Sequence, residues 1–168
     1  KCERMPDDTI VEWDDVAFEK LIRQLLQKPE GNILVEDLND ITALAILGDT
    51  HVYTEIASET SDWGYAVIDS RVEGLGAYYI TGIKSGDSKV YTQRGTIKSV
   101  DALQYFQNIE AVEIVANQIS DVSVLRTLPR LKWANFFANM IEDLSPFDGI
   151  GHPLNQYQFI KIGDPIGD

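Results

Sequence analysis

The segment 103–144 contains the same nine-position pattern twice, with equivalent positions 22 residues apart. The first copy consists of Leu103, Phe106, Ile109, Val112, Ile114, Asn117, Ile119, Asp121 and Val122. The second copy consists of Leu125, Leu128, Leu131, Ala134, Phe136, Asn139, Ile141, Asp143 and Leu144. Residue type is kept throughout, apart from the smaller Ala134 in place of Val112. A period of ~20–50 residues is typical of stacked repeats, so the pattern predicts a solenoid.

The spacing inside each repeat predicts a short strand followed by a bend. Val112 and Ile114 are two positions apart, so both side chains point to the same side of a strand. We expect Asn117 to turn its amide inward and to bond the backbone groups that the bend leaves free. Asn139 is its equivalent in the next repeat.

The first 40 residues predict a tail and a helical N-terminal cap. Phe18, Leu21, Ile22, Leu25 and Leu26 have the spacing of one apolar helical stripe. Asp14 is the expected N-cap residue, and the run 29–31 is expected to end the helix. A second short turn is predicted over 36–39, and Trp13 is expected to pack at the helix start.

Residues 41–168 are predicted to form the solenoid, with irregular parts in the middle and at the end. Leu44 and Ile46 fit a first strand. Val90 and Thr92 fall on the repeat phase and predict another strand, with Gly95 in place of the asparagine. The segment from about 51 to 89 is β-like and predicts either an inserted hairpin or one swollen, degenerate repeat. Residues 148–168 predict a last strand and a C-terminal cap.

The repeat core matches the leucine-rich repeat pattern L-x-x-L-x-L-x-x-N-x-L. The chain resembles bacterial leucine-rich repeat proteins of the 22-residue class, similar to the internalins. The tails 117–122 and 139–144 and the cap segments 18–33 and 36–38 carry the likeness. It implies an α/β fold, a right-handed β-α superhelix with a curved parallel sheet. It also implies non-enzymatic protein–protein recognition on the surface of a bacterium or outside it.

The residues between the buried strand positions are expected on the concave face of the sheet. The predicted partner-binding residues are Tyr91, Gln93, Glu113, Val115, Trp133, Asn135, Phe137, Gln156 and Gln158. Aromatic side chains on an open sheet are typical of interfaces. The alternatives are that the insertion or the C-terminal cap folds over them, or that a second copy covers them in a dimer.

Composition and missing motifs exclude several classes of function. A net charge of −13 disfavours nucleic acid and anionic membrane surfaces as partners. No apolar run approaches the ~20 residues of a transmembrane helix. The two histidines, His51 and His152, lack neighbouring ligands at metal-binding spacing. We therefore expect no enzyme, no metal site and no cofactor. The lone Cys2 leaves a lipid anchor open.

Two alternatives to partner recognition remain open. The repeats could serve as a structural spacer of a larger surface protein, in which case the concave face should tolerate charge at Trp133 and Phe137. The segment 51–89 could instead be a carbohydrate-binding module, with Trp63, Tyr78 and Tyr79 stacking on a sugar ring.

Overall fold

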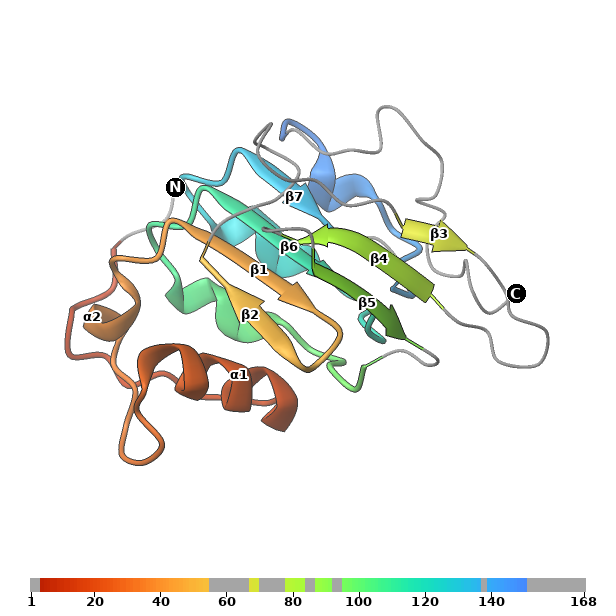
Figure 1. Ribbon diagram of the computed structural model, residues 1–168. Coiled ribbons are helices and arrows are strands. Elements are labelled where there is room, and N and C mark those ends of the chain that lie inside the picture. Colours follow the sequence, from red (N-terminus) through yellow and green to blue (C-terminus); the bar gives the residue numbers. More distant parts are fainter. Residues whose placement is uncertain are drawn as a thin grey trace.

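The computed structural model describes residues 4–54, 67–69, 78–83, 87–91, 95–136 and 139–150. The fold is mixed α/β with two sheets. The main sheet has the strand order β2 (His51–Tyr53), β1 (Ala43–Leu47), β6 (Ala111–Val115) and β7 (Trp133–Asn135). Strands β1, β6 and β7 are parallel, and β2 is antiparallel to β1 (Figure 1). The second sheet is antiparallel and contains β3 (Val67–Asp69), β4 (Tyr78–Ile83) and β5 (Asp87–Tyr91).

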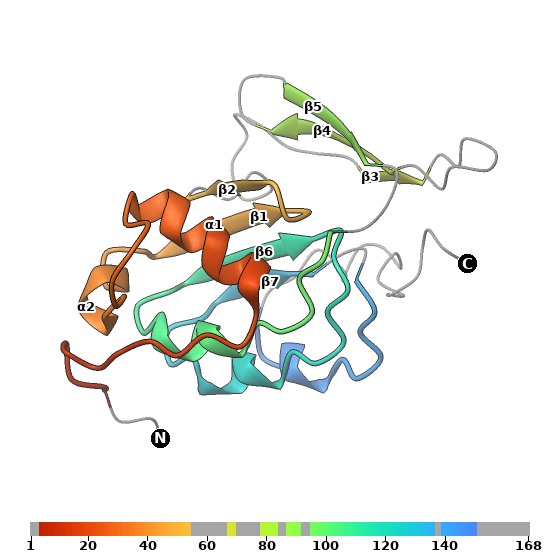
Figure 2. The same ribbon diagram turned by 90° about the horizontal axis from the view of Figure 1, so that it is seen from below.

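The 22-residue period of the sequence is present in the three-dimensional structure. Ala111 of β6 pairs with Trp133 of β7, which lies 22 positions later. The 3₁₀ turns η2 (Asp101–Tyr105), η3 (Ser123–Thr127) and η4 (Ser145–Phe147) begin at the same interval. They lie on one side of the main sheet, so each repeat consists of a strand, a bend and a turn (Figure 2).

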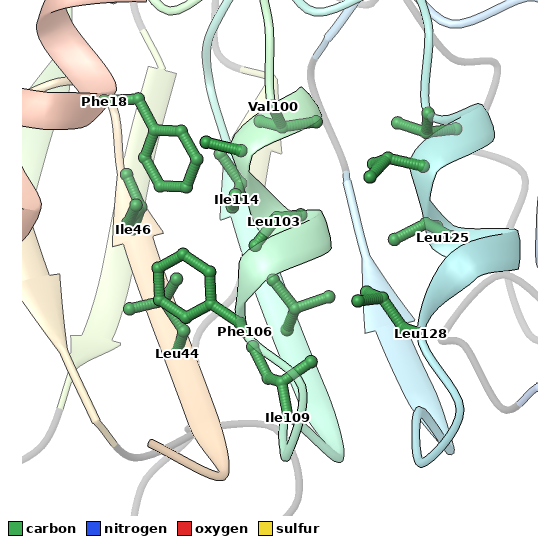
Figure 3. Packing of buried hydrophobic residues seen from close by; sticks show 14 of the residues in the cluster. Phe18, Leu44, Ile46, Val100, Leu103, Phe106, Ile109, Ile114, Leu125 and Leu128 are labelled. Atoms are coloured by element: carbon green, nitrogen blue, oxygen red, sulfur yellow. The ribbon is translucent and has the colours of Figure 1, made fainter. Parts of the chain in front are cut away.

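The core fills the space between the main sheet and the 3₁₀ turns. Leu44 and Ile46 of β1 and Ile114 of β6 are fully buried there, as expected from their alternation along the strands. Phe18 stacks on Phe106, with ring centroids 6.1 Å apart (Figure 3). The same layer continues through Leu103 and Ile109 to Leu125 and Leu128 in the next repeat.

Helix α1 (Val16–Leu26) begins one residue later than expected, because Asp15 and not Asp14 is its N-cap. Asp15 Oδ1 accepts a hydrogen bond from Phe18 N at 3.0 Å. Its Oδ2 accepts from Lys98 N at 2.8 Å and from Ser99 N at 3.0 Å. Asp14 instead accepts from Ser99 Oγ at 2.8 Å. One carboxylate therefore both starts the helix and joins it to the first repeat.

The remaining cap residues lie close to their expected places. The second helix, α2 (Val35–Leu38), is one residue earlier than the predicted 36–39. Trp13 packs edge-on against Phe18, with centroids 5.5 Å apart, which confirms its predicted packing role.

The two repeat asparagines are buried and bond the backbone, as predicted. Asn117 Nδ2 donates to Gly48 O at 2.7 Å and to Val115 O at 3.2 Å, and Oδ1 accepts from Ile97 N at 3.2 Å. Asn139 makes similar bonds, although not at the equivalent carbonyls: its Nδ2 donates to Ile114 O and Phe136 O, and its Oδ1 accepts from Ile119 N. Each amide thus connects its own repeat to the preceding one.

The predicted strand at Val90 is wrong in its placement. Strand β1 pairs directly with β6, from Ala43 opposite Ala111 to Leu47 opposite Val115. Val90 lies in β5, which pairs with β4 in the second sheet. The main sheet has no space for a strand between β1 and β6. The phase of Val90 was misleading because it follows Leu44 by 46 residues, close to two periods. The predicted antiparallel hairpin is confirmed as β4 and β5.

Candidate functional site

The main sheet has a second face, opposite the 3₁₀ turns, which we call the concave face. Strand register puts Tyr53, Ala45, Glu113 and Asn135 side by side in one row across it. The neighbouring row consists of Ala43, Ala111 and Trp133.

Small side chains form the floor of this face, and aromatic side chains flank them. Ala45 and Ala111 are buried, and Ala43, Tyr53 and Trp133 pack against them, partly buried. Alanines leave room above a sheet, whereas Tyr53 and Trp133 offer large amphipathic surfaces at either side.

The concave face is much less open than the sequence suggested. Glu113 is 1%, Val115 is 0% and Asn135 is 3% exposed. These three predicted partner-binding residues therefore do not lie on a free surface in this conformation, and the expected exposure is wrong for them. The physical reason is tertiary: the β3–β5 sheet lies on this side of the main sheet, toward the ends of β1 and β6 (Figures 1 and 2). Their role in partner binding stays a prediction.

Glu113 is the chemically notable residue of the face. A carboxylate that is 1% exposed must be compensated by hydrogen bonds or opposite charge, because desolvation of an ion is costly. Glu113 and Asn135 both have interaction partners. Any group that lies against this row must therefore meet a polar stripe within an otherwise apolar surface.

The other predicted site residues are separated from this row. Tyr91 belongs to β5 of the second sheet. Trp133 is only partly buried and lies on the concave face as expected. The positions Gln93, Phe137, Gln156 and Gln158 lie outside the described residues.

Sequence reasoning missed the contribution of β2 to this face. His51 and Tyr53 stack with ring centroids 6.3 Å apart, and both are partly buried. His51 Nδ1 and Thr50 Oγ1 are hydrogen-bonded at 2.7 Å. The available signal was the Gly48-Asp49-Thr50 turn followed by a short alternating run, which is a hairpin pattern.

The described part of the chain offers no metal centre and no membrane-spanning helix. No group of three or more metal-ligating side chains gathers within it. None of its helices combines the length and hydrophobicity needed to cross a bilayer. The proposed sugar-stacking residue Trp63 and the predicted lipid-anchor residue Cys2 both lie outside the described residues, so these two hypotheses stay untested.

Comparisons with known proteins give similarity to solved structures only. No protein-family model matches the chain, and no curated protein matches it. Among solved structures, the chain is similar to the internalin InlF from Listeria monocytogenes, with 20% sequence identity and a TM-score of 0.33. The similarity covers 83% of this chain and 42% of the internalin chain. The present chain thus spans less than half the length of that protein.

Proposed function

We propose that the chain is a leucine-rich repeat module that recognises a protein partner and has no enzymatic activity. The observation that carries this proposal is the parallel, in-register stacking of β1, β6 and β7, with buried asparagines connecting the repeats. Such stacking produces a broad and rigid sheet surface, which repeat proteins use for binding. From the motif resemblance we also propose that the module lies on the surface of a bacterium or outside it.

The contact points for a partner are the aromatic residues that flank the concave face. Trp133 and Tyr53 are partly buried and lie on opposite sides of the alanine floor. Trp and Tyr are the residue types that most often dominate interface energetics, since they bury large areas and keep a polar group.

Affinity capture with matched variants tests this function. The baits are the natural chain, Trp133→Ala and, as control, Met140→Ala, which removes an apolar side chain that is 46% exposed. Circular dichroism and melting temperature must match among the baits. A captured protein is then purified and titrated against each variant by calorimetry.

The proposal predicts that Trp133→Ala weakens binding by about 30-fold, or ~2 kcal/mol, as truncation of an interface hot spot does. Met140→Ala should bind like the natural chain. Equal affinity for all three baits would show that the partner does not bind through Trp133 on the concave face. Capture of no protein by any bait would favour the spacer alternative.

A further inference from the structure

The segment 49–94 interrupts a single repeat. The sequence separation between paired strand positions gives the length of the interruption. Leu44 and Val112 are paired in adjacent strands of the main sheet. They are 68 positions apart, 46 more than the repeat period, and 49–94 contains 46 residues. If Gly48 were followed directly by Gly95, every later position would fall on the phase set by β1.

The two ends of this segment meet in space. A Cβ on Gly95 would lie 2.6 Å from Asp49 N and 2.8 Å from Gly48 C. Gly48 N donates to Val115 O at 2.9 Å, and Gly95 N donates to Ala116 O at 2.8 Å. Consecutive residues of one repeat would make these two bonds, so the ladder continues across the gap.

Backbone conformation at the junction supports this equivalence. Gly48 has a φ of 59°, and its counterpart Ala116 in the next repeat has a φ of 63°. Asn117 then closes the base of the segment, because its side chain bonds Gly48 O before the gap and Ile97 N after it. Asp49 Oδ2 also accepts from Thr96 N at 2.9 Å.

Apart from the edge strand β2, which pairs with β1, the inserted segment contributes little to the core of the repeats. Ile97, Val100 and Leu103, which follow the gap, are fully buried and continue the core started by β1. Among inserted residues with described side chains, Val52 contacts this core, and it is only partly buried.

The inserted β3–β5 sheet instead lies on the concave side. Both views show it over the face opposite the 3₁₀ turns, toward the ends of β1 and β6 (Figures 1 and 2). Leu47 and Val115 end those strands on the concave face and are 3% and 0% exposed. An uncovered sheet would leave both open to solvent.

We propose that residues 49–94 are a removable insertion within one repeat and that the concave face is the docking surface for its β3–β5 sheet. The insertion contains five of the chain's seven tyrosines. Tyrosine suits a face that combines alanines with a buried carboxylate, because its ring is apolar and its hydroxyl is a donor. The inference does not depend on the proposed partner, which would have to displace the β3–β5 sheet while β2, with Tyr53, stays paired to β1.

Thiol labelling tests both parts of this proposal. The chain has one cysteine, so a Cys2→Ser background leaves a single introduced thiol. Val115→Cys reports on the concave face and Ile114→Cys on the core face, and both positions are 0% exposed in the intact chain. Each is made in the intact chain and in a chain that lacks 49–94, with Gly48 joined to Gly95.

Excision should leave a cooperatively folded chain and raise the labelling rate at position 115 by about tenfold or more, because burial no longer protects the thiol. The rate at position 114 should not change. Protection of position 115 in a folded, excised chain would overturn the docking part of the proposal. Loss of cooperative folding on excision would overturn the claim that 49–94 can be removed from the repeat.

A variant of the intact chain tests docking without excision. Val115→Arg places a charge on the concave face, and Ser120→Arg is the control at an exposed position of the same repeat. We expect faster limited proteolysis within 49–94 for Val115→Arg only, with the fragment 95–150 still protected. Cleavage of the insertion at the same rate in both variants would refute the docking surface.

Discussion

Gly95→Ala is the sharpest probe of the junction between the insertion and the repeats. The added Cβ would lie 2.4 Å from Asn117 Oδ1, 2.6 Å from Asp49 N and 2.8 Å from Gly48 C. Two of these atoms are backbone, and Asn117 is held in place by its bond to Gly48 O at 2.7 Å. None of the three can move without disturbing the ladder.

The cost follows from overpacking alone. Overpacking of this kind costs about 3 kcal/mol of unfolding free energy. Alanine also reduces the conformational entropy of the unfolded chain, which offsets about 0.7 kcal/mol of that cost. The net loss of unfolding free energy is therefore about 2 kcal/mol. For a chain of this size, that lowers the melting temperature by about 4–8 °C.

Gly31→Ala is the control, because it makes the same substitution at a glycine where the added Cβ meets no neighbour. Gly31 has a φ of 84°, and a Cβ there would meet nothing within 4 Å. An alanine in this left-handed conformation lowers the unfolding free energy by ~1–2 kcal/mol. The lower conformational entropy of its unfolded chain offsets ~0.7 kcal/mol of that loss, as at position 95. Urea unfolding, followed by circular dichroism, gives both free energies. Equal stability of Gly95→Ala and the natural chain would refute the close contact of the two ends.

Three further predictions concern the core, the cap and the acid stability. Ile114→Ala should lower the unfolding free energy by about 2–5 kcal/mol in urea titrations, because the residue is fully buried. Asp15→Ala removes three backbone hydrogen bonds to a carboxylate and should cost about 2–3 kcal/mol, more than Asp14→Ala in the same assay. The Leu34 N–H, and then Lys28, hold the pKa of Asp37 below its usual 3.8. The carboxylate therefore stabilises the fold fully above that pH, and the contribution disappears as the pH falls through the lowered pKa. Melting temperatures of Asp37→Asn and the natural chain should accordingly converge in acid, and a constant difference would contradict this.

The repeats were predictable because their signal is local. Strand, bend and 3₁₀ turn follow from side chains within one 22-residue period, and Asn117 and Asn139 mark the bend in each copy. The cap was predictable for the same reason, although Asp14 and Asp15 both suit an N-cap. Only the contact with Lys98 and Ser99, over 80 residues away, selects Asp15.

The insertion and the burial of the site were not predictable from the same pattern. A length of 46 residues lies close to two periods, so Val90 mimics a repeat strand. The sequence shows a glycine at position 95 where the repeat pattern has asparagine. The reason that a side chain does not fit there is the neighbouring Gly48–Asp49 backbone, which is a tertiary contact. Alternation correctly gave the direction of Glu113 and Asn135. It contains no information on what covers them.

The direct pairing of β1 with β6 also determines the order of events when the chain folds. Strand β6 meets β7 across 22 residues but meets β1 across 68. Closing the longer loop costs about 1 kcal/mol more entropy, since the cost grows with the logarithm of loop length. The segment 95–150 should therefore assemble first, and the cap should join a preformed template. Pulse-labelling hydrogen exchange would then show protected amides in β6 and β7 before β1, and the reverse order would exclude this route.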